Sequence, residues 1–594
     1  MNGALLSHAP RAIRLQVAAC LALALAACAA SKQTRSSPSA EAAPAILSVV
    51  GTNDLHGGVL PRDGVGGLAL LSGFVEALRA ARARDGGAVL LIDAGDMFQG
   101  TLESNLGEGA PVVAAYNALG YTAAAVGNHE FDFGPVGPAS VPVGPYDDPR
   151  GALKARAAEA RFPFLAANLI DESTGRPVEW PNVRPTATID AAGVRIGIIG
   201  VMTSEALSAT TSSNVVGLRI APLSSTIVEH AERLRRDGAA IVIVSAHAGG
   251  RCKSFDDPAD LSSCNPAGEI MGVAGELRPG LVDVIVAGHS HAGMAHVVNG
   301  IPIIESFAGG RAFGRVDLIV ERPGGRVLDR RIFPPRDLCA REGTQAGVCL
   351  PETSTAPAGG LPRYEGAVVS ADTTIQAVLA PAVEKAEAVK SRPLGVAAAT
   401  PVRRGGAVES PLGNLFADAL LSGIAGADAA LYNTTGGLRA DLPAGPLLYG
   451  HVYEMMPFDD RLVPIRLTGA ELRAVLARQL QRTSRILGVA GVRVRAGCEQ
   501  GAVAVDLLRP SGTPVQDHEF LTVVASDFLA TGGDNILTPV MPPGGFPVPE
   551  DAPLARDVFA GHLRERGRDL REEELVDLRN PRTSFPGSLP LACN

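Results

Sequence analysis

Five short apolar runs, each followed by polar residues, stand out in the first half of the chain. They are bounded by Gly and polar residues and consist mostly of Val, Ile, Leu and Ala, at 46–50, 89–92, 123–126, 241–244 and 284–287. Runs of this length and composition predict buried β-strands. Because the ligand crevice of an open α/β sheet lies outside the carboxyl ends of its strands, we expect one cleft where the five runs end.

Helical patterns alternate with these runs. Residues 68–84, for example, place Leu70, Phe74 and Leu78 on one helical face. This alternation predicts an α/β layer fold from about residue 45 to residue 332. Residues 333–363 are rich in Pro, Gly and Thr with little periodicity, and 372–390 predicts a linker helix with Pro381 as a candidate kink.

A second α/β pattern begins near residue 396. It predicts helices at 412–421 and 469–480, strands at 429–432, 462–467 and 520–526, and one or two charged helices within 554–578. A chain of 594 residues is too long for one compact core. We therefore expect a first domain at 45–335, a linker at 336–395 that contains a candidate disulfide and a helix, and a second domain at 396–594.

The amino terminus has the pattern of an export signal. Arg11 and Arg14 precede an apolar stretch at 15–27 that ends in small residues and is too short for a membrane-spanning helix of about 20 residues. The sequence LAAC at 25–28 resembles the lipobox of bacterial lipoproteins, which implies that Cys28 becomes a lipidated amino terminus. Cleavage nearby without lipidation is the alternative. We expect a lipoprotein signal peptide at 1–28, a flexible tether at 29–44, and an exported protein in the periplasm or on the cell surface, bound to a bacterial membrane only through lipid on Cys28.

Composition narrows the class of partner. The chain is 46% hydrophobic and 19% charged, with a formal net charge of −9. This balance is that of a soluble globular protein and disfavours a nucleic-acid polymer as partner, because binding to a phosphate backbone depends on clustered Lys and Arg. A small anionic substrate would instead be held by local cations, such as bound metal ions. The oligomeric state does not follow from the sequence.

Cysteine usage agrees with export. Of the eight cysteines, six lie beyond Cys28, and an even number in an oxidising compartment favours disulfides. Fifteen pairings are possible for six cysteines. The simplest is pairing between neighbours, Cys252–Cys264, Cys339–Cys349 and Cys498–Cys593, with free buried thiols as the alternative. No C-x-x-C pair occurs among them, so we assign them no metal.

The polar residues after the five runs are of the types that bind divalent metals: Asp54, His56, Asp96, Asn128, His247, His289 and His291. Asp54 and His56 are two positions apart, so on an extended backbone both face one metal. The two carboxylate oxygens of Asp96 suit it to bridge two metals, and Asn128 offers a neutral oxygen to the second. Mixed oxygen and imidazole ligands favour Zn, Mn, Fe or Co over Ca, and Mg is a further candidate.

Two such ions about 3.5–4 Å apart would clamp a phosphoryl group and activate a shared water as the hydroxide that attacks phosphorus. His129 follows the candidate ligand Asn128 directly and is the candidate stabiliser of the phosphoryl oxygens or proton donor to the leaving group. Asp132 would orient His129 and raise its pKa. The alternative is that His129 is another metal ligand.

The motifs NDLHGG, DAGDMFQGT, GNHEFDFG, SAHAGG and GHSH together resemble those of the calcineurin-like metallophosphoesterases, in the branch of 5'-nucleotidases and UDP-sugar hydrolases. ESPLGNLFADAL, GGLRADLPAGPLLYGHVYEMMPFDD and DFLATGGDN resemble the carboxy-terminal nucleotidase domain of that branch. The resemblance implies a four-layer α/β sandwich joined by a linker helix to a second α/β domain. It also implies one metal at Asp54, His56, Asp96 and His291, a second at Asp96, Asn128, His247 and His289, and a catalytic pair of His129 and Asp132.

The same resemblance implies that the second domain binds the nucleoside. Phe458 and Phe528 would stack on the base, Asp534 would accept hydrogen bonds from the ribose, and Arg439 would contact a phosphate. Gly436 and Gly437 would let the backbone approach the ligand closely.

We therefore expect an exported dinuclear phosphohydrolase that acts on nucleoside 5'-monophosphates, and also on nucleotide sugars or nucleoside polyphosphates. One alternative is a 2',3'-cyclic nucleotide phosphodiesterase and 3'-nucleotidase, or a relative that hydrolyses thiosulfonate esters in sulfur oxidation. Another is a non-catalytic surface binding protein, which would have no need of a complete metal-ligand set.

Overall fold

The computed structural model describes residues 42–322, 324–343, 347–351, 354, 360–405, 409–482, 486–549 and 551–593. The expected signal peptide, Cys28 and residues 29–41 of the expected tether lie outside this part of the chain. Residues 42–44, also assigned to the tether from sequence, belong instead to strand β1 (Ala42–Thr52). Within the described residues, no helix combines the length and the apolar character needed to cross a membrane.

Two β-sheets form the centre of the first domain. The first has the order β16-β15-β1-β2-β3-β4-β7, with bounds Val327–Asp337, Ala312–Arg322, Ala42–Thr52, Ala88–Asp93, Ala123–Ala125, Phe164–Leu165 and Val183–Arg184. The second has the order β13-β14-β12-β11-β9-β8, with bounds Gly293–Val298, Ile301–Ser306, Val284–Ala287, Ile241–His247, Val194–Met202 and Thr186–Ala191. All five apolar runs are confirmed as strands, but they are divided between two sheets: β1, β2 and β3 in the first, and β11 and β12 in the second.

The two sheets pack face to face through one apolar core. Leu47 and Ile92 of the first sheet and Ile198 and Ile243 of the second belong to the same cluster and are fully buried. The central strands are parallel, and β1 pairs with β2 as β11 pairs with β12. Parallel strands covered on both faces need apolar residues at consecutive positions, which explains why these runs are continuous and do not alternate.

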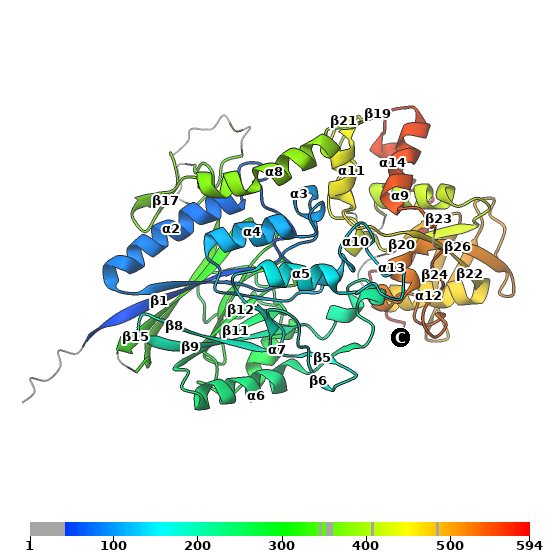
Figure 1. The fold of residues 1–594 in the computed structure, drawn as a ribbon. Coiled ribbons are helices and arrows are strands. Elements are labelled where there is room, and N and C mark those ends of the chain that lie inside the picture. Colours follow the sequence, from blue (N-terminus) through cyan, green and yellow to red (C-terminus); the bar gives the residue numbers. More distant parts are fainter. Residues whose placement is uncertain are drawn as a thin grey trace, which may run out of the picture. The chain divides into compact units, whose positions relative to one another are not determined.

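Helices cover the outer face of each sheet (Figure 1). The first sheet is covered by α2 (Leu68–Asp85), α4 (Ala110–Leu119) and α5 (Gly151–Glu159), and α8 (Thr373–Lys390) packs on α2 and α4. The second is covered by α6 (Leu223–Arg236) and α7 (Glu269–Glu276). The resulting layers of helix, sheet, sheet and helix confirm the four-layer sandwich.

The second domain is a smaller α/β unit. Its sheet has the order β22-β26-β20-β23, with bounds Leu462–Thr468, Phe520–Ser526, Ala429–Tyr432 and Gly488–Ala490. Helices α9 (Pro411–Gly423) and α14 (Ala555–Arg566) pack on one face, and α12 (Gly469–Arg482) packs on the other. Shorter elements complete it: α10 (Thr434–Gly437), α11 (Tyr449–Met455), α13 (Asp527–Ala530), η4 (Gly533–Asn535), β19 (Pro393–Ala398), β21 (Gly445–Leu448), β24 (Arg493–Glu499), β25 (Ala502–Leu508) and β27 (Thr583–Ser584).

Two local expectations need correction. The region 333–363 is not irregular from its start, because β16 continues to Asp337. Since β16 is an edge strand, Pro334 and Pro335 are tolerated there. The helical pattern of 554–578 ends early, because α14 stops at Gly567, whose left-handed φ of 63° caps it, and only the short 3₁₀ turn η5 (Glu572–Glu574) follows.

The helix expected at 372–390 and the three expected disulfides are present. Helix α8 begins at the cap Asp372, whose side chain accepts a hydrogen bond from Thr374 N, and it continues through Pro381. Near its end, Lys390 Nζ lies 2.7 Å from Glu103 Oε1 of the first domain and 3.6 Å from Glu454 Oε1 of the second. The three expected disulfides are present: Cys252–Cys264, Cys339–Cys349 and Cys498–Cys593.

Candidate metal centre and substrate pocket

The loops that follow β1, β2, β3, β11 and β12 meet at one end of the two sheets. Backbone hydrogen bonds join the first two loops, from Asp54 N to Gly95 O at 3.0 Å and from His56 N to Asp96 O at 2.9 Å. Side-chain contacts join the others. Asp54 Oδ2 accepts from His289 N at 2.8 Å, Asp96 Oδ1 accepts from His129 N at 2.8 Å, and His247 Nδ1 at the end of β11 lies 2.8 Å from Ala94 O. Direct contacts therefore hold together candidate ligands that are far apart in sequence, such as Asp54 and His289, which are 235 residues apart.

Five of the candidate ligands have left-handed backbone conformations. Their φ angles are 49°, 48°, 57°, 77° and 53° for Asp54, His56, Asp96, His289 and His291. Residues other than Gly adopt this region rarely, although Asp and His do so more often than most. Strain of this kind persists only where surrounding contacts impose it, and it concentrates at functional sites. The contacts around these loops thus hold the backbone in a less stable conformation, in which the five side chains converge.

The first ligand cluster comprises Asp54, His56, Asp96 and His291, whose potential ligand atoms all lie within 4.8 Å of one another. His56 Nε2 lies 2.9 Å from His291 Nε2 and 3.8 Å from Asp96 Oδ2. Asp54 Oδ1 lies 3.5 Å from His291 Nε2. Two carboxylate oxygens and two imidazole nitrogens therefore converge on a space of the size of one ion.

The second cluster shares Asp96 with the first. Asp96, His247 and His289 again have potential ligand atoms within 4.8 Å, and Asp96 Oδ2 lies 3.2 Å from His247 Nε2. Asn128 donates through Nδ2 to Ala209 O, which leaves Oδ1 facing His247 Nε2 at 2.9 Å and His289 Nδ1 at 3.1 Å. Asp96 occupies the corner between the clusters, where a bridging carboxylate would stand.

These residues fit divalent ions on three observations. His56 Nδ1 and His247 Nδ1 contact the carbonyl oxygens of Gln99 and Ala94 at 2.9 and 2.8 Å, so each ring is oriented by its Nδ1 and turns its Nε2 toward the cluster. Among the described residues, the buried Asp54 Oδ1 has no hydrogen-bond donor. Burial also raises the pKa of Asp54 to about 7, a shift that a bound cation would oppose.

Two of the candidate ligands, His289 and His291, favour the uncharged form. Burial, with Arg439, lowers the pKa of His291 to about 3, and burial, with His247, lowers the pKa of His289 to about 4. Neutral imidazoles are the form that binds a metal. Both side chains are therefore in the ligand form at neutral pH.

Two buried glutamates accept hydrogen bonds from the loops that carry the candidate metal ligands. Glu130 accepts from three backbone N–H groups, those of Asp96 at 2.9 Å, Met97 at 2.7 Å and Gly127 at 2.6 Å. Glu305 accepts from Gly250 N at 3.0 Å and from the Ser290 hydroxyl at 2.7 Å. Burial raises the pKa of both glutamates, and their N–H donors oppose the shift by stabilising the carboxylate. The sequence pattern alone assigns Glu130 no role.

His129 lies beside the first cluster and faces the second domain. Its Nδ1 lies 2.6 Å from Asp132 Oδ2, and Asp132 Oδ1 accepts from the Thr210 hydroxyl at 2.8 Å. Its Nε2 lies 3.3 Å from Arg439 Nη2. Burial alone would lower the pKa of His129, but the carboxylates of Asp132 and Asp96 outweigh it and raise that pKa. The ring is thus oriented by Asp132 and biased toward its charged form.

A cavity of about 610 Å³ extends from these clusters to the second domain. All the substrate-binding residues expected from sequence line it: Arg439, Phe458, Phe528, Asp534, Gly436 and Gly437. Arg439 lies over the Phe458 ring, 5.1 Å from its centroid, and Asp534 accepts a hydrogen bond from Asn433. A Cβ on Gly437 would lie 2.2 Å from the Tyr432 hydroxyl, so that glycine is also required by packing within the domain.

The cavity is lined by further polar residues that the sequence patterns do not assign, Gln99, Glu205, Thr210, Arg251 and Arg404. Glu205 and Thr210 lie in one segment after β9 and the other three come from separate loops, and none of the five stands directly after a predicted strand. Gln99 Nε2 donates to Pro457 O of the second domain at 2.8 Å. The spacing of Arg404 does not match the pattern of the family that the chain resembles. Arg404 is held by hydrogen bonds from Nη1 to Leu438 O at 2.8 Å and from its backbone N to Asp441 Oδ1 at 2.9 Å.

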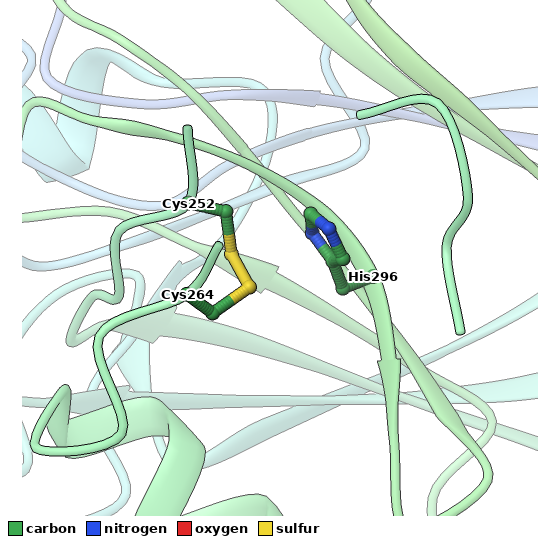
Figure 2. A group of neighbouring side chains, drawn as sticks. All are labelled: Cys252, Cys264 and His296. Carbon is green, nitrogen blue, oxygen red and sulfur yellow. A yellow bond between two sulfur atoms is a disulfide. The ribbon is translucent and has the colours of Figure 1, made fainter. Parts of the chain in front are cut away.

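Cys252 and Cys264 lie beside His296, a combination that elsewhere binds metals (Figure 2). Here the two sulfurs are joined in a disulfide, so neither is available as a thiolate. The group instead stabilises the loop between β11 and α7, at the edge of the metal centre.

Comparison with known proteins gives consistent matches for both domains. The family model described as calcineurin-like phosphoesterase matches residues 47–293, and that of the 5'-nucleotidase C-terminal domain matches residues 388–541. Endonuclease YhcR of Bacillus subtilis is 27% identical over 526 residues, covering 85% of this chain but only 39% of that protein. Protein UshA of Yersinia enterocolitica is 25% identical over 517 residues, covering 82% of this chain and 86% of UshA.

The fold matches as well. The crystal structure of the 5'-nucleotidase precursor from Thermus thermophilus superposes with a TM-score of 0.67 at 24% identity, covering 91% of this chain and 99% of that one. The two family models follow one another along the chain in the order of its two domains. The chain therefore belongs to the calcineurin-like phosphoesterases that carry a 5'-nucleotidase C-terminal domain, and it is a metal-dependent phosphoric ester hydrolase.

Proposed function

We propose that the protein hydrolyses nucleoside 5'-monophosphates to nucleosides and phosphate. The observation that carries the proposal is the composition of one cavity. On one side it has two ligand clusters that share Asp96, and on the other it has Phe458, Phe528 and Asp534. A phosphate at the clusters and a nucleoside against the aromatic rings would fill these two sides together.

Two divalent ions would be held by seven residues. Asp54, His56 and His291 would hold one, Asn128, His247 and His289 the other, and Asp96 would contact both. When bound, the ions would polarise the phosphoryl oxygens and acidify the water that attacks phosphorus. The mixed oxygen and imidazole ligands suit Zn, Mn, Co, Fe or Mg.

His129 would act on the leaving side of the reaction. Because its Nδ1 is engaged by Asp132, its Nε2 is the atom that faces the cavity. A proton at Nε2 can be donated to a phosphoryl oxygen or to the departing 5'-oxygen of the nucleoside. Arg439, 3.3 Å away, would share the negative charge that develops there.

The second domain would select the nucleoside. Phe458 and Phe528 are half-buried and line the cavity, and stacking of a base on an aromatic ring contributes about 1–3 kcal/mol. Asp534 has a left-handed φ of 52° and lies beside Asn433, where its carboxylate can accept hydrogen bonds from ribose hydroxyls. Gly436 has space around it, since an added Cβ would meet only Asn433 Nδ2 at 3.3 Å and Asp534 Oδ2 at 3.8 Å.

We further propose that the protein works outside the cytoplasm, attached through lipid on Cys28. The support is the signal pattern at 1–28 together with three disulfides, which persist in oxidising compartments. The proposed domain limits are 45–335 and 396–594. Mass measurement of the purified mature protein tests the lipid, because cleavage before Cys28 with acylation gives a distinct mass.

The function is tested by phosphate release from the purified protein with Mn, Co, Zn or Mg. The substrates are AMP, ADP, UDP-glucose, 2',3'-cyclic AMP and bis-p-nitrophenyl phosphate. We expect AMP to be hydrolysed with a higher kcat/KM than the cyclic nucleotide or the nitrophenyl diester. Preference for 2',3'-cyclic AMP would overturn the proposal in favour of the phosphodiesterase alternative, and no turnover of any substrate would favour the binding protein.

The role of His129 is tested by His129→Ala. We expect kcat for AMP to fall by about 10²–10⁴-fold, the usual contribution of a general acid, while metal content stays at two equivalents. Loss of one metal equivalent from this variant would make His129 a ligand instead. Asp534→Ala is the matched control, since it should retain both metals and raise KM for AMP.

A further inference from the structure

Arg251 stands at the first-domain side of the cavity, outside the ligand clusters. It follows Gly249 and Gly250 in the loop after His247, and it lines the cavity together with Ser290 and His291. The two loops are in close contact, because a Cβ on Gly249 would lie 2.4 Å from Gly288 O and 2.7 Å from Ser290 Cβ. Arg251 therefore emerges directly beside the loop that carries two candidate metal ligands.

The backbone on both sides of Arg251 is firmly held. Gly250 N donates to the buried Glu305 at 3.0 Å, and Cys252 N donates to Gly293 O at 3.1 Å. Arg251 O itself accepts from Asn265 N at 2.8 Å. The disulfide between the buried Cys252 and Cys264 closes the loop that begins at the next residue (Figure 2). A long side chain on a fixed base loses less freedom on binding a ligand than one on a mobile loop.

The guanidinium of Arg251 is free to bind a ligand. Arg251 is exposed, and its side chain makes no hydrogen bond or ion pair with the described part of the chain. The other two arginines of the cavity are engaged, Arg439 beside His129 and Arg404 with Leu438 O. A planar guanidinium offers five N–H donors in a fork that matches a phosphate.

Placement of the substrate identifies the group that Arg251 would meet. In the proposed function the nucleoside lies against Phe458 and Phe528 and the 5'-phosphate at the clusters. A second phosphoryl group would then need a further cation in the same cavity, and Arg251 lines that cavity beside His291. Arg439 and Arg404 belong to the second domain, whereas Arg251 belongs to the first-domain wall. We propose that Arg251 forms a subsite for the second phosphoryl group of nucleoside diphosphates and of nucleotides linked through a diphosphate. This inference rests on the proposed nucleotidase function and extends its substrate class.

The reaction at this subsite consumes one water. The water oxygen would bond to the phosphorus nearer the nucleoside, and the bond from that phosphorus to the bridging oxygen would break. The bridging oxygen leaves with the second phosphoryl group, so UDP gives UMP and phosphate, and the protons of the water pass to these products or to solvent. Arg251 takes no part in bond making. It would hold the second phosphoryl group so that the bridge lies at the metal centre, and it is thus a specificity residue.

The test compares UMP, UDP and UDP-glucose in the wild type, Arg251→Gln and Arg251→Lys. In Arg251→Gln we expect the ratio of kcat/KM for UDP to that for UMP to fall by about 10–100-fold, the range of one or two charge-assisted hydrogen bonds. Arg251→Lys should fall between, because Lys keeps the charge and loses the fork. Binding of the non-hydrolysable α,β-methylene analogue of UDP should weaken by a similar factor. Lys253→Gln is the matched control, since it removes one positive charge from the same exposed loop outside the cavity, and its ratio should not change.

Equal losses for UMP and UDP in Arg251→Gln, or no loss for either, would overturn this inference and leave the proposed function intact. Hydrolysis of UMP but of neither diphosphate by the wild type would also overturn it without affecting the proposed function. If the wild type hydrolyses no nucleotide at all, the proposed function fails and this inference fails with it.

Discussion

The two walls of the cavity are built in different ways. On the first-domain wall, the ligand side chains are mostly buried, and several are anchored by a second contact behind them. His247 is fully buried, with one ring nitrogen on Ala94 O and the other in the cluster. On the second-domain wall, Phe458 and Phe528 are half-buried and Asp534 is exposed. These residues stand on short elements, the loop after α11, helix α13 and the turn η4.

The difference matches the two tasks we assign to the walls. Stabilising a transition state requires charges fixed before the substrate arrives, and the first wall accepts strained backbone angles to achieve this. Selecting a nucleoside requires only surfaces that a base and a ribose can approach, so looser packing is tolerated. Changes on the first wall should therefore alter metal binding and kcat, and changes on the second should alter KM.

The largest effect is expected at the residue shared by both clusters. Asp96→Ala removes the carboxylate whose Oδ2 faces His247 at 3.2 Å and His56 at 3.8 Å. We expect activity to fall more than about 10³-fold, beyond the 10–100-fold cost of losing an outer partner, together with loss of both metals. Elemental analysis and phosphate release measure this. Retention of one full metal equivalent would show that the two sites do not depend on Asp96 in common.

The contrast between the walls also determines what the sequence can predict. Asp54, His56 and Asp96 are predictable because each follows a run of strand-forming residues, and the end of a strand is a local signal. Phe458 and Asp534 are predictable only through resemblance, since they follow no such pattern. Glu130 escapes prediction because two of its three partners, Asp96 and Met97, lie more than 30 residues away and contribute backbone atoms, which carry no sequence signal. The role of Arg251 cannot be predicted from sequence either, because its place in the cavity depends on how loops distant in sequence come together.

The next effect in size concerns the two buried glutamates. The three partners of Glu130 at Asp96, Met97 and Gly127 are all backbone N–H groups, so in Glu130→Gln the amide NH₂ must face a donor. Glu305 instead contacts the Ser290 hydroxyl, which can turn to accept from an amide. We expect Glu130→Gln to weaken metal affinity by about 10–100-fold and Glu305→Gln to weaken it by clearly less. Titration of the metal-free protein with Zn or Mn measures both.

The pair of variants provides its own control, because both substitutions are nearly isosteric and fully buried. Equal losses in the two would mean that charge, and not the number of donors, governs the clamp. If Glu305→Gln loses less metal affinity, as we expect, adding Ser290→Ala should lower the affinity further, to the level of Glu130→Gln. The amide would then have lost the one partner that can accept from it. An unchanged double variant would contradict the assignment of Ser290 as that partner.

A smaller effect, confined to nucleosides, is expected on the second wall. Phe458→Ala should raise KM for AMP by about 5–100-fold, from the loss of about 1–3 kcal/mol of stacking, with kcat nearly unchanged. Hydrolysis of p-nitrophenyl phosphate, which has no base, should keep its KM. If KM rises equally for both substrates, Phe458 acts through His129, whose ring centroid lies 5.8 Å away, and not through the base.

The smallest effect on catalysis is expected from removal of the disulfide Cys498–Cys593, although the loss of stability should be large. Cys498–Cys593 joins β24 to the end of the chain over a separation of 95 residues, whereas Cys252–Cys264 spans 12. In the chain-entropy view, loops of these lengths contribute about 4.7 and about 3 kcal/mol to the free energy of unfolding. Replacing both Cys498 and Cys593 by Ser should therefore lower thermal stability more than replacing Cys252 and Cys264. The order should reverse for the UDP to UMP ratio, because only the shorter loop adjoins Arg251. If the longer loop instead controls kcat, the second wall contributes to the chemistry, and the division of labour between the walls is wrong.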